Sequence, residues 1–270
     1  MPRKIVMVTG ASSGIGAATA KAFAAMGAQV VLVARNAENL NARSEEIKHG
    51  GGAAIAYAAD LSNPEAVSEL AVKVQRDAGL PDILVNNAGS GRWAPLIETS
   101  PEELRQMIEV PYLAAAYTTR AFLPSMIARG SGQIACITSP ASYLAWRDAC
   151  GYIAARHALK GFAEALRADL KGTGLHVTLA VLGAVDTSYW ANNPGSRASV
   201  PKAVPGLLPQ LSADQAAAAI VEAIERKHRV AVKPAAYRLV FAMQALAPSL
   251  VARGIRMVSR RAAGAHDPAK

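Results

Sequence analysis

The stretch Thr9-Gly10-Ala11-Ser12-Ser13-Gly14-Ile15-Gly16 decides the fold of this chain. It follows an apolar run over 4–9 that is typical of a buried strand, and a helical pattern over 14–27 begins within it. Glycines at such a junction let the backbone turn sharply and approach a pyrophosphate, which the helix N-terminus stabilises. The spacing Gly-x3-Gly-x-Gly differs from the general G-x-G-x-x-G fingerprint. We interpret it as a nucleotide-binding turn because of the residues described below.

The rest of the chain repeats this alternation of strand and helix. The spacing is that of right-handed βαβ units, which build a parallel sheet. The expected strands lie near 4–9, 29–34, 53–58, 82–86, 133–138, 175–182 and 229–232, and the expected helices near 14–27, 37–49, 63–78, 101–128, 152–171 and 212–227. We therefore predict an α/β fold, a single domain with a Rossmann-like, doubly wound parallel sheet of about seven strands.

The composition agrees with such a fold and narrows the class of protein. Of the 270 residues, 51% are apolar and only 5% aromatic, as expected when aliphatic strands are buried on both faces. No uncharged apolar stretch reaches the ~20 residues of a membrane span, and no Cys/His cluster has metal-ligand spacing. A strand starts almost at the N-terminus, which argues against a signal peptide, and we interpret Cys136 and Cys150 as reduced thiols. We expect a cytoplasmic protein without a metal.

Three expected strand ends carry side chains suited to a nucleotide. The second strand ends at Arg35 and offers no carboxylate for a ribose 2′-hydroxyl, so it favours a 2′-phosphate. Asp60 closes the third strand, where its carboxylate can accept a hydrogen bond from an adenine amino group. The fourth strand runs into Asn86-Asn87-Ala88-Gly89, whose small residues permit close approach of a cofactor. The alternatives are a solvated surface arginine at position 35 and a purely structural role for either asparagine.

A second polar group is expected at the same edge of the sheet. Ser139 ends the fifth strand and Tyr152 begins the next helix, so both lie beside the nucleotide crevice. Arg156 follows Tyr152 by about one helical turn and points from the same face. Tyrosine, with an ordinary pKa of about 10, is a poor base at neutral pH, and a nearby cation stabilises its phenolate. A serine hydroxyl beside them can hold a substrate carbonyl.

Together these residues resemble the short-chain dehydrogenase/reductase family over about residues 4–232. To the motifs above the resemblance adds Gly183-Ala184-Val185-Asp186-Thr187, where the family's backbone and threonine hold a nicotinamide carboxamide. It implies that Tyr152 is the general acid/base and that Ser139 orients the carbonyl. The implied catalytic residues are Ser139, Tyr152 and Arg156. The implied cofactor residues are Gly10, Ser12, Ser13, Gly14, Ile15, Gly16, Arg35, Asp60, Leu61, Asn87, Ala88, Gly89, Tyr152, Arg156, Val185 and Thr187.

Two of the family's four polar catalytic positions depart from its pattern, and Leu182 stands where the family usually has a proline. The family has a lysine where this chain has Arg156, and an asparagine where an ungapped count back from Leu123-Pro124 falls on Pro111. No asparagine lies between Asn87 and Asn192, so a shift of one residue would not recover one. Arginine keeps the positive charge but cannot pass on a proton, and proline has neither a polar side chain nor an N–H. In the family, the asparagine anchors a chain of water molecules that relays the proton through the lysine. Here the positive charge that stabilises the tyrosine phenolate is kept, and this proton relay is impaired.

The expected loops near this edge carry large side chains. Those expected to line a bulky substrate pocket, with packing as the alternative for each, are Arg92, Trp93, Trp146, Tyr189 and Trp190. The segment 191–210 is rich in Pro, Gly and Ser, and we expect a long mobile loop of the kind that covers a site. His157 points about 100° away from Arg156 round the helix, which favours a packing or surface role.

Basic charge is concentrated towards the C-terminus. Of the 29 Lys and Arg residues, nine lie between Arg226 and His266, a segment without Asp or Glu. We divide the chain into an NADP(H)-binding domain, 1–233, which includes the substrate loop 191–210, and a basic, apolar helical extension, 234–270. The extension has three alternative roles: peripheral contact with an anionic membrane, packing on the domain, or packing on a second subunit. Nucleic acid is not expected, because no recognition motif accompanies the charge.

The predicted function is that of an NAD(P)H-dependent oxidoreductase. We expect it to interconvert a carbonyl and an alcohol on a small hydrophobic substrate, with NADP preferred over NAD. The family resemblance implies a homodimer or homotetramer. Pro111 and Arg156 leave two alternatives open on the same scaffold. One is a nucleotide-binding protein that has lost turnover, and the other is altered chemistry such as dehydration or imine reduction.

Overall fold

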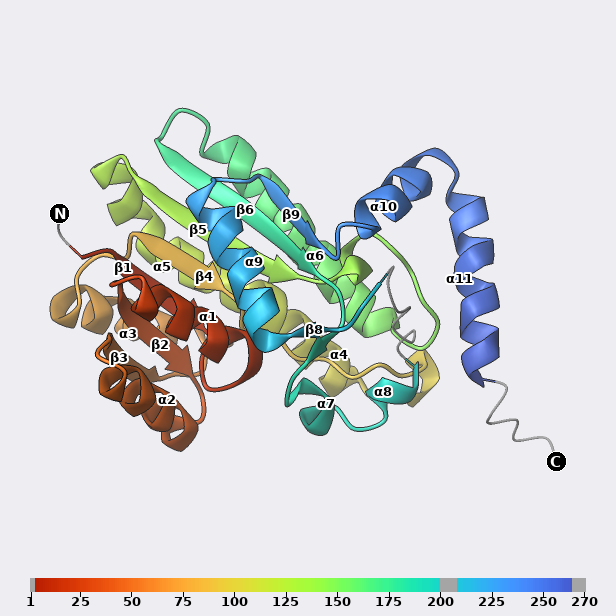
Figure 1. Ribbon diagram of the computed structural model, residues 1–270, viewed down its shortest axis with the longest axis horizontal. Helices are drawn as coiled ribbons and strands as arrows, with labels where there is room; N and C mark the ends of the chain where they lie inside the picture. The colour runs from red at the N-terminus through yellow and green to blue at the C-terminus, as the bar shows by residue number, and fades with distance from the viewer. Residues whose placement is uncertain (1–2, 200–207, 264–270) are drawn as a thin grey trace.

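The computed structural model describes residues 3–199 and 208–263. Its centre is a sheet of seven parallel strands in the order β3-β2-β1-β4-β5-β6-β9 (Figure 1). The strands are β1 (Ile5–Thr9), β2 (Gln29–Ala34), β3 (Ala53–Ala58), β4 (Ile83–Asn86), β5 (Gly132–Thr138), β6 (Leu175–Leu182) and β9 (Val230–Lys233). The predicted Rossmann-like α/β sheet of seven strands is confirmed.

Helices cover both faces of this sheet. One layer contains α1 (Gly14–Ala25), α2 (Ala37–His49) and α9 (Ala213–Glu225), and the other contains α3 (Pro64–Asp77), α5 (Ala114–Arg129) and α6 (Cys150–Asp169). Val6 and Val8 of β1 pack towards the first layer, and Met7 between them packs towards the second. Because both faces of each central strand are buried, the strands are continuously apolar in sequence.

The strand order reverses beside β1. β2 and β3 lie on one side of β1, whereas β4, β5, β6 and β9 lie on the other. The connections after β1 and β4 therefore leave in opposite directions and open a crevice at the carboxyl ends of these strands. The glycine stretch follows β1, Asn87 follows β4, and Ser139 follows β5. The topology brings these three segments to one edge.

A π turn interrupts the helix predicted over 101–128. α4 (Pro101–Ile108) and α5 are joined by a π-helical turn, η2 (Glu109–Leu113), in which Pro111 is buried. Proline cannot donate to the helical hydrogen-bond ladder, and its ring collides with the preceding turn of an α-helix. A widened turn accommodates both defects while the chain keeps its helical direction.

Short elements and two further helices complete the fold. The short elements are η1 (Leu96–Glu98), η3 (Pro140–Ser142), β7 (Val185–Asp186), α7 (Tyr189–Asn192), α8 (Ser196–Ser199) and β8 (Leu211–Ser212). The segment 191–210, expected as a loop, thus contains helical turns as far as Ser199, and 200–207 lie outside the described residues. α10 (Tyr237–Leu246) and α11 (Pro248–Ala263) follow β9, far from α2 and α3 (Figure 1).

Two kinds of feature are absent from the described part of the chain. None of its helices combines the length and hydropathy needed to cross a membrane. Within residues 3–199 and 208–263, no three His, Cys, Asp or Glu side chains gather as metal ligands would.

Candidate active site

The carboxyl edge of the sheet opens into a cavity of about 1230 Å³. Pockets for small ligands commonly measure roughly 300–1000 Å³, so this one has room for a dinucleotide together with a substrate. Ser139, Tyr152 and Arg156 all line it. The other predicted cofactor residues that line it are Gly10, Ser12, Ser13, Gly14, Ile15, Arg35, Asp60, Leu61, Asn87, Ala88, Gly89, Val185 and Thr187.

Gly16 is the exception, because it supports the glycine turn from behind. A Cβ at this position would lie 2.2 Å from the carbonyl oxygen of Gly10 and 2.6 Å from Asn87 Nδ2. Only glycine therefore lets α1 begin so close to the end of β1. Gly16 therefore has a structural role in this turn, and its contact with a cofactor stays a prediction. Gly14, by contrast, lines the cavity with a left-handed φ of +55°.

Basic side chains gather where β2 and α2 border the cavity. Arg35 lies there as the sequence predicts, together with Lys21 of α1 and Arg43 of α2. Asp60 accepts hydrogen bonds from the amide of Ser62 at 3.0 Å and from its hydroxyl at 2.7 Å. These bonds, and the positive charge of Arg35 nearby, hold the pKa of Asp60 below its ordinary value. Glu46 of α2 also lines the cavity and accepts from Arg43 Nη1 at 2.7 Å, so this end of the cavity offers cations and two carboxylates.

Asn86 and Asn87 both hold the sheet edge together. Asn87 Nδ2 donates to the Thr9 carbonyl at 2.9 Å, and the amides of Asn87 and Ala88 each donate to the Thr9 hydroxyl at 3.0 Å. Asn86 Nδ2 donates to Thr119 Oγ1 of α5 at 2.9 Å. Both asparagines therefore have a structural role, and Asn87 lines the cavity as well.

Ser139 and Tyr152 are joined by a hydrogen bond. The Tyr152 hydroxyl donates to Ser139 Oγ at 3.2 Å, and the amide of Ala141 donates to the same oxygen at 3.2 Å. The η3 turn thus fixes the serine, while the first turn of α6 presents the tyrosine to the cavity. Two hydroxyl groups converge where a carbonyl oxygen could be both held and protonated.

The Arg156 guanidinium is buried without a carboxylate partner among the described residues. The residue is 7% exposed, and its Nε has no hydrogen-bond partner within residues 3–199 and 208–263. Its Cζ lies 4.7 Å from the ring centroid of Tyr152, and a Cβ on Gly89 would lie only 3.0 Å from its Nη2. A buried charge with unsatisfied donors is costly. Such donors at a cavity indicate a ligand with oxygen acceptors, and ribose hydroxyls of a nucleotide fit this need.

Pro111 does not line the cavity. The π turn that contains it packs against α6, and its neighbour Val110 presents an apolar side chain to the cavity instead. The position assigned above to the family's asparagine thus presents no polar side chain to the cavity.

Aromatic side chains form a wall beside Tyr152. The ring centroid of Trp93 lies 5.4 Å from that of Tyr152 and 5.9 Å from that of Trp146. Tyr189 and Trp190 line the same cavity. Burial raises the pKa of Tyr189, the charge of a Tyr152 phenolate raises it further, and the Tyr189 hydroxyl donates to the Gly91 carbonyl.

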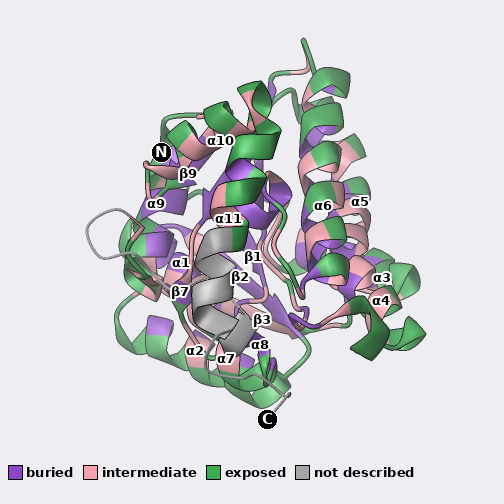
Figure 2. Ribbon diagram, turned by 90° about the vertical axis from the view of Figure 1, so that its right-hand side faces the viewer, coloured by how far each residue is buried: buried purple, intermediate pink, exposed green. Residues whose placement is uncertain are grey.

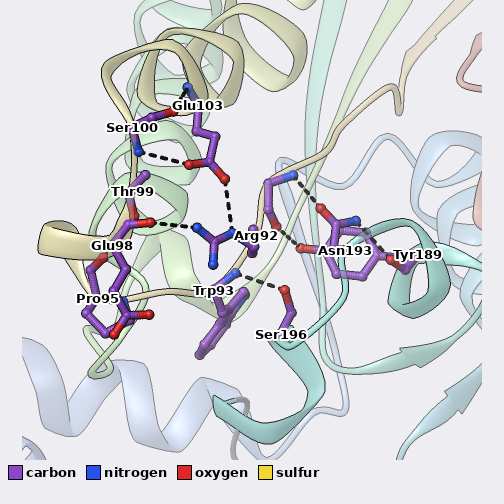
Figure 3. A network of polar contacts seen from close by, with 11 residues as sticks. Arg92, Trp93, Pro95, Glu98, Thr99, Ser100, Glu103, Tyr189, Asn193 and Ser196 are labelled. Carbon is purple, nitrogen blue, oxygen red and sulfur yellow. Dashed lines mark hydrogen bonds and ion pairs between the residues drawn. The ribbon is translucent and has the colours of Figure 1, made fainter.

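Arg92 is the one loop residue expected at the pocket that lies elsewhere. Its Nε donates to Glu103 Oε1 at 3.0 Å, and its Nη2 donates to the Glu98 carbonyl at 2.8 Å (Figure 3). The arginine therefore ties its own loop to the start of α4. It is a packing residue, the alternative given for it above.

The segment after Tyr189 is fastened to the loop after β4 (Figure 3). Asn193 Oδ1 accepts from the Gly91 amide at 3.2 Å, and Asn193 Nδ2 donates to the Tyr189 carbonyl at 2.9 Å. Ser196 Oγ accepts from the Trp93 amide at 2.9 Å. Asn193 and Ser196 are buried. They position Trp93 and Tyr189. The sequence analysis did not identify them, because it predicted a mobile loop over 191–210.

α10 adds a cavity residue that the sequence analysis missed, Tyr237. Its ring stacks on Phe241 at 5.8 Å, and Phe241 stacks on Tyr143, in the loop after Ser139, at 4.2 Å. A Cβ on Gly183 would lie 3.2 Å from Tyr237 Cε2. The start of the C-terminal segment is thus packed against two segments that flank the cavity. The sequence signal that could have indicated this packing is the pair of aromatic residues Tyr237 and Phe241, four positions apart on one helix face.

The chain belongs to the short chain dehydrogenase family, whose sequence model it matches over residues 4–197. A short chain dehydrogenase of Pseudocercospora fijiensis is 41% identical to it over 175 residues. The match covers 64% of this chain and 56% of that relative, so the chain spans little more than half of the relative's length.

Solved structures agree with this assignment. An alcohol dehydrogenase from the archaeon Thermococcus sibiricus, complexed with 5-hydroxy-NADP, is 31% identical with a TM-score of 0.74. The match covers 86% of this chain and 95% of that one. A short chain dehydrogenase/reductase from Burkholderia phymatum, in complex with NAD, is 24% identical with a TM-score of 0.81 over 92% and 95% of the two chains, and shares the fold. The chain is thus a member of an oxidoreductase family that uses NAD(P).

Proposed function

We propose that this protein uses NADP(H) to interconvert a carbonyl and an alcohol on a small hydrophobic substrate. The observation that carries the proposal is the hydrogen-bonded pair of Ser139 and Tyr152 with the Arg156 guanidinium beside the tyrosine ring. The three side chains line one cavity with the glycine turn. The alcohol dehydrogenase of Thermococcus sibiricus, held with an NADP derivative, supports the reaction class.

The chemistry divides between the cofactor and the chain. When bound, a nicotinamide supplies or accepts the hydride. In the reducing direction, the Ser139 hydroxyl donates a hydrogen bond to the carbonyl oxygen, and Tyr152 transfers its proton to that oxygen as negative charge develops there. In the oxidising direction, the Tyr152 phenolate removes the proton of the alcohol. General acid/base catalysis of this kind typically contributes about 10²–10⁴-fold to the rate.

Arg156 acts in this scheme as a fixed cation. It stabilises the phenolate left on Tyr152, and its donors suit ribose hydroxyls. Because arginine cannot release a proton and Pro111 has no polar group, neither residue can pass a proton onward. Tyr152 therefore regains its proton from water or through a ribose hydroxyl. We infer turnover that is real but slower than an intact relay would allow.

The preference for NADP over NAD is inferred from charge. Arg35, Lys21 and Arg43 line the cavity near the end of β2, and Arg35 lies close enough to Asp60 to lower its pKa. A ribose 2′-phosphate would be the natural partner of such cations. The remaining cavity wall, with Trp93, Trp146 and Val110, favours an apolar substrate.

The quaternary structure is inferred from the family, and the location from the expectations given in the sequence analysis. We infer a cytoplasmic homodimer or homotetramer. Sedimentation velocity on the purified chain tests the assembly.

A nucleotide-binding protein without turnover is the second candidate. Arg156, which cannot release a proton, and Pro111, which has no polar side chain, favour it, since both impair the relay. Altered chemistry, such as imine reduction or dehydration, is a variant of the same idea. Retention of Ser139, Tyr152 and Thr187 in the cavity favours the oxidoreductase, because a protein that only binds nucleotide has no evident need of all three.

One assay separates the candidates. Wild type is incubated with NADPH and a panel of hydrophobic aldehydes, ketones and imines, and with NADP⁺ and the matching alcohols, while absorbance at the NADPH band is followed. Turnover with a carbonyl or alcohol, lost in Tyr152→Phe, supports the proposed function. Binding of NADPH without turnover on any substrate supports the second candidate.

A further inference from the structure

The exposed face of α10 is apolar, and its opposite face is also apolar and packs against the domain. Tyr237 and Phe241 pack against Tyr143 and the rest of the domain. On the other side, Leu239, Met243 and Leu246 follow one another at the spacing of a single helix face. They are 68%, 45% and 87% exposed, and Leu250 in the first turn of α11 is 60% exposed. A helix that is apolar on both sides is normally covered on both sides.

We call these four leucine and methionine residues the apolar stripe (Leu239, Met243, Leu246 and Leu250), and the two helices that carry them also carry positive charge. Arg238 on α10, and Arg253 and Arg256 on α11, are all exposed. Neither α10 nor α11 contains an Asp or Glu, and none occurs anywhere between Arg226 and His266. The charge therefore has no carboxylate partner within these helices. Whatever covers the stripe must supply both apolar contact and negative charge.

The place of the two helices in the fold leaves this surface open. α11 contacts α10 and α8 and otherwise stands clear of the sheet and its two helical layers (Figure 1). Seen from that side, the described turns of α10 and α11 are largely exposed (Figure 2). Nothing in the described part of the chain folds over the stripe.

We propose that the apolar stripe and its arginines attach this protein to an anionic lipid surface. Apolar side chains of amphipathic helices enter the boundary between headgroups and acyl chains, while basic residues bind anionic headgroups. A second copy of the chain fits less well, because a symmetric contact through the stripe would bring the arginines of one copy close to those of the other. The attachment is peripheral, since no described helix is able to span a membrane.

Sedimentation with vesicles tests the attachment. The purified full chain is mixed with vesicles of phosphatidylcholine alone or with phosphatidylserine, at low salt and at about 0.5 M salt, where screening lengths are a few ångströms. We expect binding to the phosphatidylserine vesicles at low salt, most of it lost at high salt. Binding that is absent at low salt, or equal on both kinds of vesicle, overturns the proposal.

Matched variants assign the binding to this surface. Each basic residue near an anionic surface contributes about fivefold to partitioning, so Arg253→Gln with Arg256→Gln should weaken it by about 25-fold. The control for charge is Arg120→Gln with Lys171→Gln, which removes two exposed cations elsewhere. Leu246→Gln with Leu250→Gln should weaken binding at least about tenfold, and Val72→Gln with Ile97→Gln is its control. If the control variants lose as much vesicle binding as the test variants, binding does not occur through the apolar stripe and its arginines.

Two measurements keep structural failure and self-association apart from lipid binding. Thermal unfolding must be unchanged in each variant that is compared, and residues at these exposed positions should meet that condition. Sedimentation velocity without lipid gives the assembly state. If the leucine variant is smaller than wild type in solution, the stripe is an interface between copies, and the lipid proposal is overturned. All readouts are independent of catalysis, so failure of the proposed function would leave them unaffected.

Discussion

The guanidinium carbon of Arg156 lies 4.7 Å from the ring centroid of Tyr152, about one turn earlier in the same helix. Both residues are buried at the cavity, where the interaction of a cation with an aromatic ring is strengthened by the loss of water. The contact places a permanent positive charge beside the group proposed to exchange a proton. This arrangement preserves charge stabilisation without a means of proton transfer.

Removing the charge of Arg156 should therefore slow catalysis strongly. A unit charge at this distance, with an effective dielectric constant near 20, contributes at most roughly 3.5 kcal/mol, or about 400-fold in rate. We expect Arg156→Met to lower kcat/KM by up to that factor, whereas Arg156→Lys should change it by less than about tenfold. Steady-state kinetics on the substrate found in the panel measure both. Full activity in Arg156→Met would contradict the role of a fixed cation.

Restoring both members of the relay should do more than restoring either. The double change Pro111→Asn with Arg156→Lys is expected to raise kcat/KM beyond the product of the two single effects, because residues that act as a unit are not additive. The four proteins of this cycle are compared at one pH with the same substrate. Effects that simply multiply would show that position 111 takes no part in proton transfer here.

Cofactor preference should depend on Arg35. Hydrogen bonds to charged groups contribute about 1.5–3 kcal/mol, so Arg35→Ala should weaken NADPH binding by roughly 10- to 100-fold and leave NADH binding nearly unchanged. Fluorescence titration of both cofactors gives the dissociation constants. Arg120→Ala, an exposed arginine that does not line the cavity, is the control. Equal affinities of wild type for NADH and NADPH would refute the preference.

Asn193 should stabilise the fold as well as the site. It accepts from the Gly91 amide and donates to the Tyr189 carbonyl while buried. An unsatisfied buried group costs about 1–3 kcal/mol, so Asn193→Ala should reduce the free energy of unfolding by that amount. Its exposed neighbour provides the control, Asn192→Ala. Denaturant unfolding compares them, and equal stability of the two variants would mean that the Asn193 bonds contribute nothing.

Tyr237 should contribute to activity through the packing of its aromatic ring and not through its hydroxyl. It packs against Gly183 and Phe241, and none of the hydrogen bonds found for the described residues involves its hydroxyl. Tyr237→Phe is expected to retain wild-type kinetics, whereas Tyr237→Ala should lower kcat/KM several-fold through loss of packing at the cavity. Tyr117→Ala, a partly buried tyrosine of α5 remote from the cavity, controls for general loss of stability. Unchanged kinetics in Tyr237→Ala would remove α10 from the site.

The fold was accessible from sequence because its strands are buried on both faces. Runs such as Gln29–Ala34 and Leu175–Leu182 are almost wholly apolar, and parallel strands place their carboxyl ends at one edge. That rule alone brought the glycine turn, Asn87 and Ser139 together. The spacing of Tyr152 and Arg156 needed only helical periodicity.

Other features depend on packing between segments far apart in the chain. Lys21 and Arg43 lie on helices whose orientation towards the cavity is set by the sheet, and no local pattern marks them. Asn193 and Ser196 become important only when the Gly91 and Trp93 amides are opposite them. The sequence analysis predicted one helix over 101–128 and did not anticipate the π turn that contains Pro111. No pattern among neighbouring residues in the sequence predicts such features.

The most direct test of the account is consumption of NADPH in the presence of hydrophobic carbonyl compounds by wild type and by Tyr152→Phe. We predict measurable turnover by wild type and a loss of about 10²–10⁴-fold in the variant, with NADPH binding by both, because the phenol is the proton donor. Turnover that survives in Tyr152→Phe would contradict the assignment of the acid/base. Tight NADPH binding by wild type without turnover on any carbonyl, imine or alcohol would contradict the proposed activity itself.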